Sequence, residues 1–164
     1  MDLMARVQGF IAMKQKKLAE ELAEKYRVSE DEVSEVVESF LADTYGPAQK
    51  LAGDICGKEV PVLLFIGKKD CAVCKRCLPD FERFLQEHKD LEPIMIDYTQ
   101  AEGLLYHAIQ QQDKGMLPLI AMIAQGDIKM FFAGECIGHE AYEKYYQDLH
   151  GKCSQNIYAH SEIT

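Results

Sequence analysis

The most informative part of the sequence is Val60-Pro61-Val62-Leu63-Leu64-Phe65-Ile66-Gly67, which is followed after three residues by Cys71-Ala72-Val73-Cys74. The short apolar run from 60 to 67 predicts a buried strand. The amphipathic run from about Cys71 to His88 predicts a helix that begins at the first of the two cysteines. The sequence therefore places a pair of thiols where a buried strand gives way to a helix.

Helical geometry predicts different surroundings for these two thiols. At about 100° per residue, Cys74 projects into the apolar stripe that Cys77 and Phe81 share, whereas Cys71 lies at its edge. Unpaired backbone N–H groups and the positive end of the helix dipole stabilise a thiolate at a helix start. We therefore expect an accessible, attacking Cys71 with a lowered pKa, and a shielded, resolving Cys74 that can close a disulfide with it.

From Val60 to about His150 the chain resembles the thioredoxin-like superfamily, in which a strand leads into a Cys-x-x-Cys helix start. Lys75 follows the second cysteine and Pro79 lies five residues after it, as is common in that superfamily. Leu117-Pro118-Leu119-Ile120 is similar to the element in which a cis-proline opens a strand facing the dithiol. The resemblance implies a central mixed sheet flanked by helices, and a cis Pro118 that shapes a substrate groove.

The chain also departs from thioredoxin itself at positions close to the two thiols. Asp70 stands in place of the tryptophan before the first cysteine, and Ala72-Val73 in place of Gly-Pro between the thiols. Phe65 aligns with the buried acidic residue, and leucines flank Pro118 on both sides. The two leucines predict an apolar docking surface beside the dithiol, and the other departures indicate a protein other than thioredoxin itself.

Composition limits the classes of function. The chain has 164 residues, is 48% hydrophobic and carries a net charge of −9, which argues against a nucleic-acid partner or an anionic membrane. Its apolar runs are too short to span a bilayer, and Arg6, Gln8 and Gly9 interrupt the apolar N-terminal stretch, so we expect a cytoplasmic protein. Six cysteines are too few for a disulfide scaffold.

The first 57 residues are predicted to form a helical extension. Apolar residues at helical spacing indicate a helix from Met4 to Tyr26, and Ser29 with Glu32 indicates a capping box that starts a second one. We expect this second helix to end near Asp43, before Tyr45-Gly46-Pro47, and a short third helix to follow over 47–56. The side chains expected to face inward on the second helix are Val33, Val36, Val37, Phe40 and Leu41.

The rest of the chain predicts an α/β domain over residues 58–152. The expected elements are a strand over 93–98, a helix over 101–113, hairpin strands over 119–124 and 128–132, and a final helix over 139–150. Residues 153–164 are predicted to be a polar C-terminal tail.

The other cysteines allow several interpretations. Cys77 extends the motif to Cys-x-x-Cys-x-x-Cys, which is compatible with an iron–sulfur or zinc site, but Phe81 stands where a fourth ligand belongs. We therefore interpret Cys77 mainly as a small core residue. Cys136 lies in the loop before the last helix, which in the resembled fold can approach the dithiol, so an auxiliary role stays open.

The leading hypothesis is a thiol–disulfide oxidoreductase in which Cys71 and Cys74 act on protein disulfides, without a cofactor or metal. The expected partners are protein disulfides and an electron donor that the sequence does not name, with no nucleic acid and no membrane. A homodimer through the helical extension is a further expectation. The alternatives are a non-catalytic binding or redox-sensing module, and a metal or iron–sulfur carrier using Cys71, Cys74 and Cys77.

Overall fold

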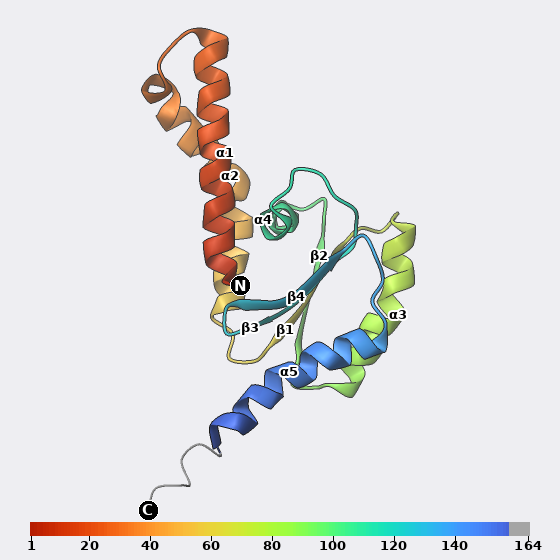
Figure 1. Ribbon diagram of the computed structural model, residues 1–164. Coiled ribbons are helices and arrows are strands. Elements are labelled where there is room, and N and C mark those ends of the chain that lie inside the picture. Colours follow the sequence, from red (N-terminus) through yellow and green to blue (C-terminus); the bar gives the residue numbers. More distant parts are fainter. Residues whose placement is uncertain (158–164) are drawn as a thin grey trace, which may run out of the picture.

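The computed structural model describes residues 1–157, and for residues 152–157 it describes the helix backbone alone. Within these residues, no helix is both long and apolar enough to cross a bilayer. The elements, in chain order (Figure 1), are α1 (Leu3–Tyr26), α2 (Glu30–Cys56), β1 (Val62–Gly67), α3 (Ala72–Glu87), β2 (Glu92–Asp97), η1 (Ala101–Leu104), α4 (Leu105–Gln110), β3 (Leu119–Ala124), β4 (Asp127–Ala133) and α5 (His139–Ile157).

The four strands form one mixed sheet in the order β2-β1-β3-β4. Strand β1 pairs in parallel with β2 and antiparallel with β3, and β3 pairs antiparallel with β4. Every residue of β1 is buried, as expected for a central strand that is covered on both faces. The mixed sheet flanked by helices, predicted from the sequence, is confirmed.

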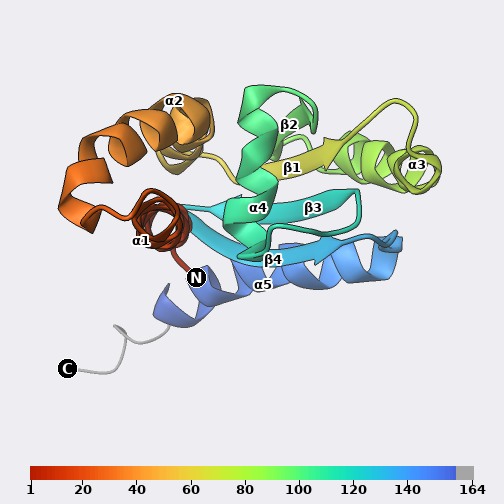
Figure 2. The ribbon, with the colours of Figure 1, turned by 90° about the horizontal axis from the view of Figure 1, so that it is seen from above.

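Helices cover both faces of this sheet. Figure 1 and Figure 2 together show α1, α2 and α4 on one side of the sheet, and α3 and α5 on the other. Successive side chains of β1 point to opposite faces. Val62, Leu64 and Ile66 accordingly pack in one core cluster with residues of α1, α2 and α4, while Leu63 and Phe65 pack in a second cluster with residues of α3 and α5.

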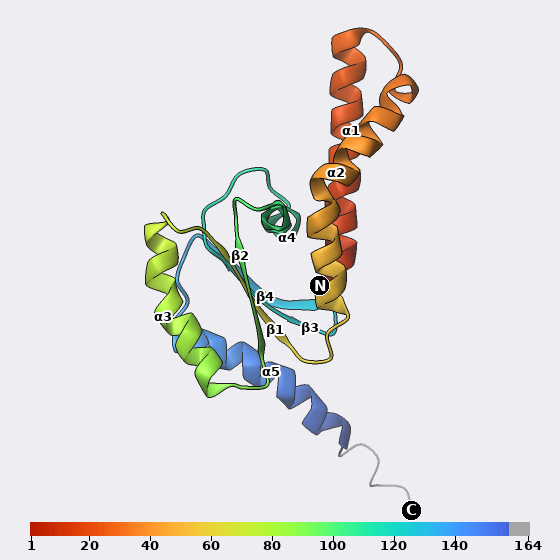
Figure 3. The ribbon, with the colours of Figure 1, turned by 180° about the vertical axis from the view of Figure 1, so that it is seen from behind.

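The beginning of the helical extension packs into the core on one face of the sheet. Leu3, Val7 and Phe10 of α1 are no more than 1% exposed and belong to the same cluster as β1. The N-terminus is also tied to the β3–β4 hairpin, because Leu3 N donates to Gly126 O at 2.9 Å. Farther out, the two helices project beyond the sheet (Figure 3) and enclose a small cluster of their own.

The second helix is longer than predicted. Its predicted start is confirmed, because Ser29 and Glu32 form the capping box. The predicted end near Asp43 and the separate third helix are wrong, since α2 continues through Pro47 to Cys56. Proline removes one backbone hydrogen bond and disfavours a helix, but Leu41 on one side and Ala52 on the other are both buried against neighbours. Packing on both sides of Pro47 outweighs its local preference.

The prediction that Val36 and Phe40 face inward is also wrong. Their side chains are 66% and 56% exposed, whereas Val37 is fully buried. The apolar stripe on this part of α2 is wider than the surface that its neighbour α1 covers, so one edge of it faces outward.

Elsewhere the predicted elements differ mainly in their ends. The helix expected over 101–113 is a 3₁₀ turn, η1, followed by the short α4, which ends at Gln110. Helix α5 continues to Ile157, into the range predicted as a tail, and residues 158–164 lie outside the described part of the chain.

Candidate active site

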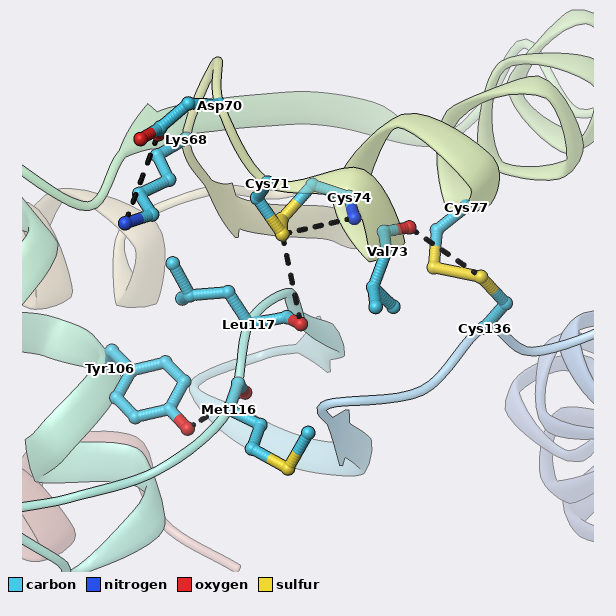
Figure 4. Close-up of a disulfide and its surroundings, with 10 residues drawn as sticks. All are labelled: Lys68, Asp70, Cys71, Val73, Cys74, Cys77, Tyr106, Met116, Leu117 and Cys136. Carbon is cyan, nitrogen blue, oxygen red and sulfur yellow. Dashed lines mark hydrogen bonds and ion pairs between the residues drawn. A yellow bond between two sulfur atoms is a disulfide. The ribbon is translucent and has the colours of Figure 1, made fainter.

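The Cys-x-x-Cys motif lies at the beginning of α3 (Figure 4). Cys71 is the N-cap of this helix, and its Sγ atom accepts a hydrogen bond from Cys74 N at 3.1 Å. The two cysteines form a disulfide with Cα atoms 5.2 Å apart. Cys71 is half-buried and Cys74 is 2% exposed, which is the order of accessibility that the helical stripe predicts. Backbone N–H groups at this helix end would stabilise negative charge on the first sulfur.

A glycine lets the strand and the helix start approach each other. Gly67 ends β1, and a Cβ atom added there would lie 2.7 Å from the Phe65 ring and 3.1 Å from Cys74 Sγ. Both neighbours are buried, so neither has room to move away. The absence of a side chain at Gly67 therefore allows Cys74 to pack directly behind the strand.

The loop before β3 faces the first sulfur. The Leu117–Pro118 peptide bond is cis, as the resemblance implies. The Leu117 backbone oxygen lies 3.9 Å from Cys71 Sγ. The loop is held from behind by Tyr106 of α4, whose hydroxyl donates to Met116 O at 2.9 Å. In Figure 4, Tyr106, Met116 and Leu117 lie one after another in space on the way to the Cys71–Cys74 disulfide.

An apolar pocket of about 510 Å³ lies on the other side of the motif. Its wall includes Phe65, Cys74 and Met95, and lysines 68, 69 and 75 also line it. Asp97 stands at this pocket as well, and hydrogen bonds from the hydroxyl and backbone N–H of Thr99 hold the pKa of its carboxyl below the usual range. The face of the motif toward β2 is therefore apolar with charged groups around it.

A second disulfide lies beside the first. Cys77, one turn farther along α3, is joined to Cys136 in the loop between β4 and α5, with Cα atoms 4.9 Å apart. Cys77 is 1% exposed, whereas Cys136 is exposed. The helical stripe predicts the burial of Cys77, and the resemblance implies the approach of the Cys136 loop, but neither predicts that the two cysteines pair. The only available signal was the resemblance, which brings that loop near the motif.

The four cysteines at and beside the motif are joined in two separate disulfides, not gathered as one set of metal ligands. Cys77 is paired with Cys136, which leaves Cys71 and Cys74 as a separate pair. Among the described residues, no group of three or more His, Cys, Asp or Glu side chains is placed to hold a metal ion. Cys56 is a half-buried free thiol, and burial raises its pKa.

On its own topology, the chain has a thioredoxin-like fold: a mixed sheet in the order β2-β1-β3-β4, a Cys-x-x-Cys pair at the helix that follows β1, and a cis-proline before β3. No protein-family model matches the sequence, and a search of curated proteins gives no match.

Solved thioredoxin structures are similar to this chain. Desulfothioredoxin from Desulfovibrio vulgaris Hildenborough is 15% identical, with a TM-score of 0.49 over 59% of this chain and 88% of that one. Thioredoxin O2 from Arabidopsis thaliana is 14% identical, with a TM-score of 0.48 over 65% of this chain and 89% of its own. Thioredoxin F from spinach chloroplast, in its long form, is 16% identical, with a TM-score of 0.45 over 63% and 80% of the two chains.

Proposed function

We propose that the protein is a thiol–disulfide oxidoreductase that acts on protein disulfides through Cys71 and Cys74. The observation that carries this proposal is the unequal exposure of a closed disulfide at a helix start. Cys71, the more exposed sulfur, receives the Cys74 N–H at 3.1 Å, while Cys74 is buried behind it. A partner can reach the first sulfur, and the second is close enough to displace it.

The proposed reaction begins with the reduced pair. The Cys71 thiolate attacks one sulfur of the partner's disulfide, that disulfide breaks, and the released partner thiolate takes up a proton. The Cys74 thiolate then attacks Cys71 Sγ, so that the Cys71–Cys74 bond forms and the partner's second sulfur leaves. Two electrons pass to the partner, and an external dithiol returns the pair to its reduced form.

We further propose that Pro118 and Leu117 shape the groove that receives the partner. Proline lacks an N–H that could compete for the substrate chain. The Leu117 oxygen lies 3.9 Å from Cys71 Sγ, so an extended peptide could lie along this loop with its sulfur near Cys71. The apolar surroundings of the motif favour a protein substrate with apolar residues beside its disulfide.

Turnover of a protein disulfide, with dithiothreitol as the electron donor, tests the proposed function. Cys71→Ser should abolish turnover because it removes the attacking sulfur, and Cys74→Ser should halt the reaction at a mixed disulfide. Cys56→Ser is the matched control, since Cys56 is a free thiol outside the motif and should leave turnover unchanged. Normal turnover by Cys71→Ser would refute the assignment of Cys71 as the attacking sulfur, and no turnover by the folded wild-type protein would favour a non-catalytic binding module.

We also propose that two copies associate through the extension, and that the protein works in the cytoplasm. The outward-facing Val36 and Phe40 on α2 support the first proposal, since they provide exposed apolar surface on the projecting helices. The Cys71–Cys74 pair supports the second, because disulfides of cytosolic proteins are usually transient and catalytic, as this pair is proposed to be. Sedimentation of the intact chain over a range of concentrations would measure the association.

A further inference from the structure

The Cys77–Cys136 disulfide has the same unequal exposure as the Cys71–Cys74 pair. Cys77 is 1% exposed and packs in the apolar cluster between the sheet, α3 and α5. Cys136 lies outside that cluster and is exposed to solvent. One sulfur is therefore open to attack from outside, and the other is placed to leave into a shielded site.

The second disulfide also contacts the first site. Cys136 Sγ lies 3.7 Å from the backbone oxygen of Val73, the residue immediately before Cys74 (Figure 4). When Cys136 is reduced, its thiol has this carbonyl oxygen available as a hydrogen-bond acceptor. The first turn of α3 therefore offers the reduced form of Cys136 a hydrogen-bond partner.

We propose that Cys77 and Cys136 form a second redox couple, which exchanges with external dithiols at the Cys136 sulfur independently of Cys71 and Cys74. A thiolate of the external dithiol attacks Cys136 Sγ, the Cys77–Cys136 bond breaks, and Cys77 leaves as a thiolate that takes up a proton. The second thiolate of the reductant then attacks the reductant sulfur bound to Cys136. Cys136 leaves as a thiolate, and the reductant becomes a disulfide.

This inference goes beyond the proposed function, because it assigns a second exchange site with its own cysteines. The couple also links α3 to the loop before α5 across 59 residues of sequence. Opening it would release that loop from the helix that carries Cys71 and Cys74. A purely structural disulfide would instead remain closed for as long as the protein is folded.

The first test uses the variant Cys71→Ser/Cys74→Ser, so that its result does not depend on the proposed function. The oxidised variant is equilibrated with graded ratios of reduced and oxidised dithiothreitol, quenched with acid, alkylated, and mapped by peptide mass spectrometry. Mapping separates Cys77 and Cys136 from Cys56 and Cys153. Circular dichroism at each ratio shows whether the protein is folded.

The proposal predicts that Cys77 and Cys136 change together from unlabelled to fully labelled while the circular dichroism spectrum stays native. Two results would overturn it. One is labelling of both cysteines already in the oxidised variant, which would mean that no disulfide forms. The other is a disulfide that resists reduction until denaturant unfolds the protein, which would make it structural only.

The second test asks which sulfur is attacked. In the same background, Cys77→Ala removes the disulfide partner of Cys136, and Cys136→Ala removes the disulfide partner of Cys77. With oxidised glutathione, the Cys136 thiol should form a mixed disulfide at least about 10-fold faster than the Cys77 thiol, because reactivity follows exposure. Equal rates, or a faster Cys77, would contradict the assignment of Cys136 as the exchanging sulfur, provided both variants show native melting transitions.

Discussion

The hydroxyl of Tyr106 donates a hydrogen bond of 2.9 Å to the backbone oxygen of Met116, two residues before Pro118. Tyr106 is 1% exposed, and a Cβ atom on Gly115 would lie 1.9 Å from its hydroxyl oxygen, so the ring is held closely by the loop that it supports. A residue of α4 thereby positions the segment that faces Cys71.

Tyr106→Phe removes this hydroxyl, so the Met116 oxygen loses its hydrogen-bond donor. We expect the free energy of unfolding to fall by about 0.5–1.5 kcal/mol. We also expect KM for a protein disulfide to rise, while the rate with a small-molecule disulfide stays unchanged, because only docking uses the loop. Tyr98→Phe is the control, because the Tyr98 ring contacts the Tyr106 ring but its hydroxyl forms a hydrogen bond with His107 and not with Met116. Equal kinetic effects of the two substitutions would refute the positioning role.

Gly67→Ala should disturb the packing behind Cys74. The added methyl group would lie 2.7 Å from the Phe65 ring and 3.1 Å from Cys74 Sγ, and both neighbours are buried. Overpacking of this kind costs about 1–3 kcal/mol of stability, which denaturant unfolding would measure. Gly53→Ala is the control, because no atom lies within 4 Å of the added carbon there. A Gly67→Ala protein as stable as the wild type would show that the strand and the helix start tolerate more separation.

Substitutions at two phenylalanines distinguish the contribution of the extension to folding stability from its proposed role in self-association. Phe10 is fully buried in the core of the sheet, so Phe10→Ala should lower the free energy of unfolding by about 3–5 kcal/mol. Phe40 is 56% exposed, so Phe40→Ala should change it by no more than about 0.5 kcal/mol.

Sedimentation of the same two variants tests the association. Phe40→Ala should weaken self-association without loss of stability, because it removes exposed apolar surface from the projecting helices. If Phe40→Ala instead destabilises the chain as much as Phe10→Ala does, α2 must be covered by its own chain at that position.

The contact between α3 and α5 should weaken in acid. Glu87 accepts a hydrogen bond from His139, which holds the pKa of its carboxyl below the ordinary value. A lowered pKa in the folded state gives stability that is present above the unfolded-state pKa and is lost as the pH falls through the folded-state value. The melting temperature of Glu87→Gln should therefore lie below that of the wild type at pH 7, and the gap should close as the pH falls below about 4.

Glu82→Gln, an exposed position on the same helix, is the control for that pH series. A gap between Glu87→Gln and the wild type that stays constant into acid would show that the carboxylate charge of Glu87 contributes nothing to this contact.

Local signals predicted the parts of the fold that depend on neighbours in sequence. Ser29 caps α2 and Cys71 begins α3, because caps are determined within one helical turn. The resemblance supplied the cis bond before Pro118. The Cys77–Cys136 pair could not be predicted in this way, since its partners are 59 residues apart and nothing in either local sequence names the other.

The two wrong predictions for the extension, an inward Phe40 and a helix end before Pro47, have a common physical origin. An apolar stripe shows which residues can be buried, but not how much of the stripe a neighbour covers, so the stripe alone predicts an inward Phe40 although its side chain is exposed. Pro47 is a strong local signal for a helix end, yet the packing of α2 on both sides of it prevails. Both features are determined by tertiary contacts.

Mapping the mixed disulfide that Cys74→Ser forms with a protein disulfide would identify the attacking sulfur directly. The variant is mixed with the substrate, quenched with acid, and digested for mass spectrometry without reduction. We expect the substrate sulfur to be bound to Cys71, the half-buried N-cap of α3, because the hydroxyl that replaces the Cys74 thiol cannot resolve the bond. A mixed disulfide found on Cys136 instead, or none at all from a folded variant, would contradict this expectation.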